Sequence, residues 1–549
     1  MLVGQSTAEY VLTRAFIYFG SYLGLICLVY FYLALSIGGV AAIASPISIF
    51  IEVIGAIEIL FYLCWFLPYR HYLHKQRAAF PRPLTCEERK ELVDMILAVT
   101  PDTELFVRKW MCGASLGDLR RENLKEWLLW ALFDSSAPPG DDDEELEGYV
   151  TEIEERLGTA IKPGWGPAKS LRMNFDKFTV THRTLLYYFA IGIVDLVTSI
   201  ALLISGFSFY RQPRAAFIRS FPFRPFTLLA PNESAAPNIS HFYRPHTSKT
   251  HRSIVFIHGV GVGLFPFLPL LRNLPKEIGI VAIELLPISS RITTAMPLAE
   301  DLKREIGDIV AQHDVKDFVL VANSYGTLLT RQFLESAFLA SKLHSIVMID
   351  PLSVLLHLPD MAYKLTKRTP AEANELQLWW VAQTEPDIAF TLSRRFCWRE
   401  HVIWKEDLIG GNVTLIIGGR DCVVNSEAIA AYVTTDESKL GTNDAAHGNL
   451  RWTSQDMEQW NKSVNEWKGQ GLELVWLEGL DHGQAFTNKN ARSKVLGIIE
   501  KYCERDTDGA GGDASEPASE TSSRTSKDGA VIQEQEMFSV LSGSGQPKI

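Results

Sequence analysis

"FVLVANSYGTLL", residues 318–329, is the stretch of sequence that says most about the fold. The apolar, β-branched run before Ser324 favours a buried strand, and the residues after it can begin a helix. A serine at such a turn is either a helix N-cap or an exposed nucleophile. The stretch alone does not separate these two interpretations, so residues elsewhere in the chain have to decide.

Apolar runs of the same kind recur after residue 252. They read "SIVFIHG", "GIVAIELL", "DFVLVANS", "SIVMIDP", "VTLIIGG" and "LELVWLEG", and helical stretches such as 298–312 and 325–338 lie between them. Strands that alternate with helices predict an α/β fold, a doubly wound and mostly parallel sheet with helices on both faces. We place this domain at residues 211–503.

Three polar residues stand just beyond three of these runs. Ser324 follows "VLVAN", Asp421 follows "VTLIIGG", and His482 follows "LELVWLEG". The carboxyl ends of parallel strands meet at one edge of a sheet, so these side chains are expected to lie together. A serine hydroxyl needs a base in contact to become a nucleophile. His482 is predicted to take its proton and return it to the leaving group, while Asp421 fixes the imidazole tautomer.

The loop "HGVGVG" after the first run is predicted to complete this site. A tetrahedral intermediate needs backbone N–H donors for its oxyanion. We expect one from Tyr325, directly after the serine, and one from Val260 in the loop. Gly259 and Gly261 allow the backbone to approach a substrate closely. His258 is expected to hold this loop rather than to act as a second base.

Four motifs, "FIHGVGVG", "ANSYG", "IIGGRDCVV" and "LEGLDHGQAF", resemble those of the α/β-hydrolase superfamily. The resemblance covers residues from about 250 to 503 and implies a lipase- or esterase-like serine hydrolase with no metal and no organic cofactor. Ala322 stands where the Gly-x-Ser-x-Gly pattern has its first glycine, as it does in some lipase-like members. The N-terminal half resembles membrane-anchored hydrolases of fungal type, although no comparable motif supports that likeness.

Other interpretations of single residues remain open at this point. Ser324 by itself could be a helix cap, and Asp421 by itself could be a turn residue. Asp350, after "SIVMI", competes for the role of the acid, because some lipases of the superfamily carry the acid on that strand. The context of "GGRD" favours Asp421, and Asp350-Pro351 then ends a strand.

Long apolar runs near the N-terminus predict membrane helices. Residues 15–43 carry no charge, and a second run covers 47–67, so residues 1–80 are expected to form a hairpin of two spans. The basic segment "RHYLHKQRAAFPR" places the end of this hairpin in the cytosol. We therefore expect an integral protein of endomembranes, such as the endoplasmic reticulum or the lipid-droplet surface.

A third apolar run at 184–210 contains one charge, Asp195. It either crosses the membrane or lies as a buried or interfacial helix beside the α/β domain. Two spans leave that domain in the cytosol, which is favoured, whereas three place it in a lumen, where Asn232 and Asn238 could carry glycans.

Residues 81–183 are predicted to form a soluble helical region that begins with a capping box at Thr85. Its stretch 136–156 is so acidic that a solvated linker is expected, and the polar tail 504–549 is expected to be disordered. The net charge of −11 is concentrated in such segments, and no basic cluster indicates a nucleic-acid partner. The seven cysteines are scattered, which favours free thiols.

An insertion at 354–408 is expected to form a lid over the serine. Its aromatic side chains, which include Trp379 and Trp380, could be only its own small core or could face an apolar substrate. A lipidic acyl ester and membrane lipids are the expected partners, and the sequence sets no oligomeric state. An acyltransferase or thioesterase with the same triad, and a non-catalytic membrane scaffold, are the alternatives.

Overall fold

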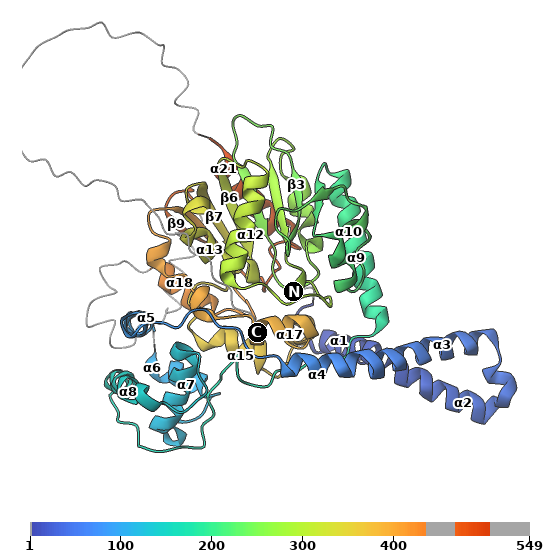
Figure 1. Cartoon of the computed structure of the whole chain (residues 1–549), viewed down its shortest axis with the longest axis horizontal. Helices are drawn as coiled ribbons and strands as arrows, with labels where there is room; N and C mark the ends of the chain where they lie inside the picture. Colours follow the sequence, from blue (N-terminus) through green and yellow to red (C-terminus); the bar gives the residue numbers. More distant parts are fainter. Residues whose placement is uncertain (1–2, 101, 435–466, 506–549) are drawn as a thin grey trace, which may run out of the picture. The chain divides into compact units, whose positions relative to one another are not determined.

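The computed structural model describes residues 3–100, 102–434 and 467–505. From residue 506 onward, the tail predicted to be disordered lies outside the described residues. The described strands form one nine-stranded sheet in the order β2-β1-β3-β5-β4-β6-β7-β8-β9 (Figure 1). The strands are β1 Ser208–Arg211, β2 Asn232–Glu233, β3 Ser240–Arg244, β4 Ser253–Ile257, β5 Ile280–Glu284, β6 Phe318–Asn323, β7 Leu343–Ile349, β8 Asn412–Gly418 and β9 Leu472–Leu477.

The sheet is mostly parallel, as the sequence predicts. Strands β4 to β9 pair in parallel with one another, and β3 is antiparallel to both β1 and β5. Successive residues of a strand enter different apolar cores, since Val319 and Val321 belong to one and Leu320 to the other. Both faces of β6 are therefore buried, which explains its uninterrupted apolar run.

Helices cover both faces of this sheet. One face packs against α12 (Ala299–Gln312), α13 (Thr330–Glu335) and α18 (Ser426–Thr434), and the other against α11 (Leu268–Asn273) and α21 (Lys489–Cys503). The short helices α10 and α14 occupy Pro225–Leu229 and Ala337–Ala340. This arrangement confirms the predicted doubly wound α/β class.

The N-terminal region consists of α1 (Thr7–Ser21), α2 (Leu23–Ile43), α3 (Pro46–Phe61), a π-helical turn (Tyr62–Phe66) and α4 (Leu67–Lys75). Among the described residues, Leu23–Ile43, Pro46–Lys75 and Leu185–Ile204 are long and apolar enough to cross a membrane. Figure 1 shows α2 and α3 side by side as a hairpin. Gly55 is in close contact with Cys27, because a Cβ there would lie 2.5 Å from the Cβ of Cys27.

Helix α9 (Leu185–Ile204) is the third apolar run, and it packs along the α/β domain. Its Asp195 forms ion pairs with Arg224 and Arg291, both at 3.1 Å. Its first N–H groups donate to Glu58 of α3, at 3.0 Å for Leu185 and 3.2 Å for Leu186. The opposite face of α9 is apolar and exposed, at Leu186, Phe189, Ile193, Val197, Ile200 and Ile204. These contacts favour an interfacial helix over an independent span.

The sequence predicts a solvated linker at 136–156, and this prediction is wrong. Most of the stretch forms helix α8 (Asp143–Leu157). Its buried residues Leu146, Tyr149, Val150 and Ile153 recur at helical spacing. The acids lie on the outer face, where several pair with arginines of neighbouring helices. Helix α8 packs with α5 (Cys86–Val99), α6 (Thr103–Trp110) and α7 (Arg121–Phe133), and the core of these helices is continuous with that of the sheet.

The insertion between β7 and β8 is helical and held on two sides. It contains α15 (Pro359–Thr366), α16 (Ala373–Leu378), a π-helical turn (Trp379–Gln383) and α17 (Pro386–Arg394). Tyr69 of α4 donates to the Asp387 carboxylate at 2.9 Å, and Asn374 donates its backbone N–H to the Gly4 carbonyl at 3.0 Å. Phe390 and Phe396 are buried in the core, whereas Trp379 and Trp380 are half-buried.

Candidate active site

Ser324 stands at a sharp turn between β6 and the 3₁₀ turn Ser324–Leu329 that leads into α13. Its φ is 50°, in the left-handed region that non-glycine residues rarely occupy. Thr327 fixes this turn, because its hydroxyl donates to the Ser324 carbonyl at 2.6 Å and accepts the Leu352 N–H at 2.9 Å. Strain that neighbouring contacts hold in place is typical of functional positions.

Two glycines bring the turn close to the end of β4. A Cβ on Gly326 would lie 2.6 Å from the Ile257 carbonyl oxygen, and a Cβ on Gly259 would lie 2.7 Å from the Cβ of Ser324. Any side chain at either position would therefore push the serine away from the loop that follows β4.

Ser324, His482 and Asp421, the three residues predicted from the strand ends, meet in one hydrogen-bonded chain. Ser324 Oγ lies 2.8 Å from His482 Nε2, and His482 Nδ1 lies 2.7 Å from Asp421 Oδ2. An Nδ1–H that donates to the carboxylate leaves Nε2 free to accept the serine proton. All three side chains are largely buried, which strengthens their electrostatic interactions.

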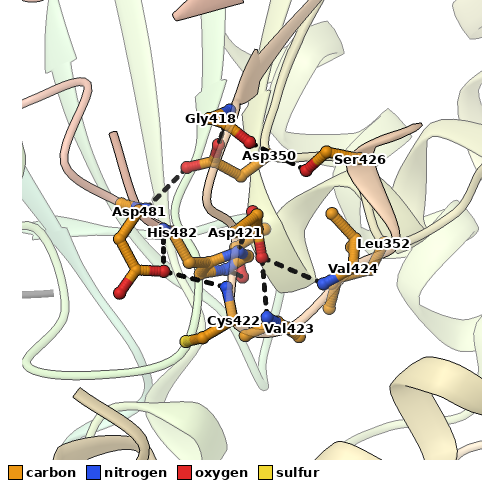
Figure 2. A network of polar contacts seen from close by, with 12 residues as sticks. Asp350, Leu352, Gly418, Asp421, Cys422, Val423, Val424, Ser426, Asp481 and His482 are labelled. Carbon is orange, nitrogen blue, oxygen red and sulfur yellow. Dashed lines mark hydrogen bonds and ion pairs between the residues drawn. The ribbon is translucent and has the colours of Figure 1, made fainter. Parts of the chain in front are cut away.

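Asp421 is held as an anion by its surroundings. Its Oδ1 accepts the backbone N–H groups of Val423 at 2.7 Å and Val424 at 2.9 Å, as Figure 2 shows. Burial favours the neutral acid, but His482 and these two donors outweigh it and lower the pKa of Asp421. Burial likewise opposes a charge on His482, yet the Asp421 carboxylate raises the pKa of that imidazole above its ordinary value.

The strand order and the place of the serine together decide the fold. The parallel strands run in the order β5-β4-β6-β7-β8-β9, and the serine follows the central strand β6, while Asp421 and His482 follow β8 and β9. The chain has the α/β-hydrolase fold. The fold expected from the four sequence motifs is thereby confirmed.

No family model and no curated protein matches the sequence. In structure the chain is similar to a membrane phospholipase A described as a bacterial virulence factor, with 14% identity, 58% of this chain and 94% of that chain covered, and a TM-score of 0.35. It is also similar to a carboxylesterase from Bacillus subtilis, with 12% identity, 56% and 98% covered, and a TM-score of 0.29. A thermophilic esterase from Thermogutta terrifontis is a further similar structure, with 8% identity, 48% and 94% covered, and a TM-score of 0.31.

Similarities this distant do not bear on activity, so the chemistry of this α/β-hydrolase fold has to be argued from its own residues. The likeness of the N-terminal half to fungal membrane-anchored hydrolases stays a prediction.

Asp350, the competing acid, lies beside the triad but faces other partners. Its carboxylate accepts the N–H of Gly483 at 2.6 Å and of Gly418 at 3.3 Å, so it links the ends of β7, β8 and β9 (Figure 2). Burial raises the pKa of Asp350 to about 6, and nearby His482 partly offsets that rise. The imidazole Nδ1 points to Asp421, which makes Asp421 the better candidate for the triad acid.

Asp481, directly before His482, connects two loops of the site with the insertion. Its Oδ1 accepts the N–H groups of Cys422 at 2.8 Å and of His482 at 2.7 Å, which ties the acid loop to the histidine loop (Figure 2). Its Oδ2 accepts the side-chain amide of Asn374 in the insertion at 2.7 Å. The sequence offered one signal, the acid next to His482, but nothing pointed to Asn374.

The predicted oxyanion loop reaches the serine as its glycines suggest. The N–H of Gly261 donates to the Ile288 carbonyl at 3.0 Å, so the N–H of Val260 is the better candidate to face a substrate together with that of Tyr325. His258 is fully buried; its Nδ1 lies 2.8 Å from the Gly259 carbonyl, and its Nε2 accepts the Leu285 N–H at 3.0 Å. Burial lowers the pKa of His258 to about 4, which suits a structural role.

Asp350, Asp421 and His482 also bring potential metal ligands within 4.8 Å of one another. All four carboxylate oxygens accept a hydrogen bond, from backbone N–H groups or from the imidazole. Donors that converge on an oxygen stabilise its negative charge and take the lone pairs that a cation would need. The donor set therefore fits a serine–histidine–aspartate site better than a metal site.

Proposed function

We propose that this protein is a membrane-associated serine hydrolase that cleaves acyl esters of lipids. The observation that carries the proposal is the chain of hydrogen bonds from Ser324 through His482 to Asp421, at 2.8 and 2.7 Å, with the serine in a strained turn. A serine with a base and an oriented acid is the arrangement that nucleophilic acyl transfer needs.

In the proposed reaction Ser324 Oγ attacks the acyl carbonyl carbon while His482 Nε2 takes the hydroxyl proton. The oxyanion that forms is placed at the N–H groups of Val260 and Tyr325. His482 then gives its proton to the departing alkoxide, which leaves as an alcohol, and the acyl group stays on the serine. Water attacks this ester with His482 as base again, releases the carboxylic acid and restores the hydroxyl.

The lipidic substrate is proposed from the setting of the site. The insertion beside the triad is hydrogen-bonded to the N-terminal region, through Asn374 to Gly4, just before α1, and through Asp387 to Tyr69 of α4. Helix α2 and the continuous helix from α3 to α4 (Pro46–Lys75) are long and apolar enough to span a bilayer, so the site is tied to elements suited to lie in lipid. We place the protein at an endomembrane with the hydrolase body on the cytosolic side, where the basic segment after α4 would also lie.

A fluorophosphonate probe with the full-length protein in detergent tests the triad. We expect an adduct on Ser324, none in Ser324→Ala, and full labelling in Ser341→Ala, which removes an exposed hydroxyl of the same domain. If folded protein gives no adduct on Ser324, the chain is a scaffold with an unreactive site. A series of esters, thioesters and alcohol acceptors with that protein then separates hydrolase, thioesterase and acyltransferase, and a preference for short, soluble esters would contradict a lipidic substrate.

A further inference from the structure

A cavity of about 670 Å³ lies where the N-terminal helices meet the insertion between β7 and β8. Its walls come from α1, α2, the continuous helix of α3 and α4, residues 180–182, and the two tryptophans Trp379 and Trp380. Sites for small organic ligands have volumes of roughly 300–1,000 Å³, so this space is large enough for one.

The lining of the cavity is mostly apolar. Its hydrophobic side chains include Ile17, Leu25, Leu28, Ile59, Phe66 and Trp380. Several of them belong to candidate membrane spans, so the side of the cavity formed by α2 and α3 is suited to face hydrocarbon. Ile59 and Arg70 lie on one continuous helix, about 16 Å apart at 1.5 Å per residue. That length suits the greater part of an extended acyl chain.

The polar residues of the lining differ in whether another group of the protein already pairs with them. Glu58 accepts the first N–H groups of α9, so its charge is already compensated. Arg70 is exposed and forms no ion pair with any carboxylate of the described residues, and its nearest aromatic partner is the ring of Phe66 at 5.7 Å. Nδ1 of His182 is buried and has no hydrogen-bond partner among the residues that the structure describes. An uncompensated cation at one end of an apolar space suits an amphiphile with an anionic group.

The wall formed by Trp380 is fixed and adjoins the catalytic machinery. The guanidinium carbon of the buried Arg183 lies 3.4 Å from the centre of the Trp380 ring, and Arg183 also donates to the hydroxyl of Thr384 at 3.3 Å. The π-helical turn with Trp380 directly continues α16, whose Asn374 donates to Asp481 next to His482. A ligand in the cavity would therefore contact the element that borders the triad.

We infer that this cavity binds the long acyl chain of a bilayer lipid, with an anionic oxygen of the lipid at Arg70. The inference deepens the proposed function and rests on it in one respect only, the delivery of the acyl group to Ser324. We assign a bilayer lipid to the cavity because α2 and the continuous helix from α3 to α4, which form part of the wall, are candidate spans.

Photolabelling of full-length protein in liposomes tests this inference without any turnover. Two probes carry the same diazirine on a long acyl chain, one as the free fatty acid and one as phosphatidylcholine, and mass spectrometry maps the adducts. We expect adducts on α1, on the α2 residues that line the cavity, and on Trp379 or Trp380. Ser21→Trp and Leu28→Trp should each reduce these adducts severalfold, whereas Ile37→Trp, on an exposed part of α2 that is not among the lining residues, should not.

Arg70→Gln should reduce cavity labelling by about tenfold through the loss of a charge-assisted hydrogen bond, whereas Arg77→Gln should leave it unchanged. Labelling by the phospholipid would support the inference, whereas labelling by the fatty acid alone would overturn the bilayer lipid as the occupant and identify the hydrolysis product in its place. Adducts confined to the outer face of α2 would overturn the inference. Cavity labelling that neither Ser21→Trp nor Leu28→Trp reduces would also overturn it.

The same experiment in Ser324→Ala separates this inference from the proposed function. One outcome is that the wild type gives no fluorophosphonate adduct while cavity labelling persists in Ser324→Ala. That result would support the lipid site and contradict the proposed hydrolase. An active hydrolase whose preference for long over short esters stays unchanged in Leu28→Trp would keep the enzyme and reject the cavity as its acyl site.

Discussion

At the scale of the residue, the site depends on a serine that the fold holds in an unfavourable backbone conformation. Ser324 has φ at 50°, and the hydroxyl of Thr327 holds the turn by bonding to the Ser324 carbonyl at 2.6 Å. The conformation presents Oγ to His482 at 2.8 Å. The strained backbone at Ser324 therefore lowers the stability of the fold at the position where the proposed reaction needs a rigidly placed nucleophile.

Substitution of Ser324 should separate activity from stability. We expect Ser324→Ala and Ser324→Gly to lose essentially all ester turnover, because both lack the nucleophile. Glycine adopts a positive φ without a Cβ clash, so Ser324→Gly should be more stable to unfolding than Ser324→Ala by about 1 kcal/mol. Thermal unfolding of the two purified variants measures this difference. A large loss of stability in both would mean that the hydroxyl has a structural role.

The pH dependence of kcat/KM should report the imidazole. His482 can act as base only when neutral, and Asp421 raises its pKa above the ordinary value of 6.5, so activity should rise with pH through a midpoint above that value. Asp421→Asn removes this effect, so that burial, which lowers the pKa of His482, is opposed by the weaker effect of Asp350. The midpoint should then move to lower pH while kcat falls by about 10⁴.

Asp350→Asn is the matched comparison, since Asp350 is the other acid beside His482. It should shift the midpoint less and cost much less activity than Asp421→Asn. The reverse order of the two losses in kcat would show that Asp350 is the acid of the triad.

At the scale of the element, α8 and α9 show how composition can mislead. The acids of α8 suggested a solvated linker, yet Leu146, Val150 and Ile153 recur at helical spacing and are buried. Helix α9 is apolar enough for a span, yet one of its faces packs on the α/β domain. Its single charge, Asp195, pairs with two arginines of that domain instead of facing lipid. Both helices bury one face against neighbouring elements, which composition alone does not reveal.

Asp195→Asn tests how α9 is held. If α9 packs on the domain as described, the variant leaves Arg224 and Arg291 buried with less compensation and should lower the free energy of unfolding by about 3–5 kcal/mol. Asp308→Asn, an exposed acid on α12, should change it by no more than about 0.5 kcal/mol. Thermal unfolding of full-length protein in detergent gives both values. A neutral or stabilising effect would indicate an independent span, from which loss of a charge is favourable.

At the scale of the whole molecule, the contacts of α9 fit a proposed topology with two spans, α2 and the continuous helix from α3 to α4. In that topology α9 would lie at the membrane surface, with its exposed apolar face toward the lipid. The helices α5 to α8 and the hydrolase body share a continuous core, so the proposed topology would put them on the same side of the membrane.

Labelling of sealed microsomes with an impermeant maleimide tests this topology. In a background in which the other exposed cysteines, Cys64 and Cys86, are replaced by serine, Cys112 reports the region before α9, and a Ser341→Cys variant adds a second thiol at an exposed position of the hydrolase body. Both thiols should react equally without detergent. Asn232 and Asn238 should carry no glycan, so glycosidase treatment should leave the electrophoretic mobility unchanged. Reaction at only one of the two thiols before permeabilisation would show that α9 crosses the bilayer.

The sequence by itself determined the class of the fold and the three residues that meet in the site. Alternating strands and helices predict a parallel sheet, and the carboxyl ends of parallel strands lie at one edge, so Ser324, Asp421 and His482 could be grouped without a structure. The same local logic predicts Val260 and Tyr325 as oxyanion donors, because an oxyanion loop and a nucleophile turn are short, continuous motifs.

Only the tertiary structure decided which acid faces the imidazole, what holds the site and how α9 is placed. Asp350 and Asp421 follow two neighbouring strands, β7 and β8. Only the direction in which His482 Nδ1 points shows which of the two acids pairs with the imidazole. Asn374 reaches Asp481 from an insertion more than a hundred positions earlier, and Asp195 meets arginines from two separate loops. Periodicity and composition describe neighbours along the chain, whereas these contacts join residues that only packing brings together.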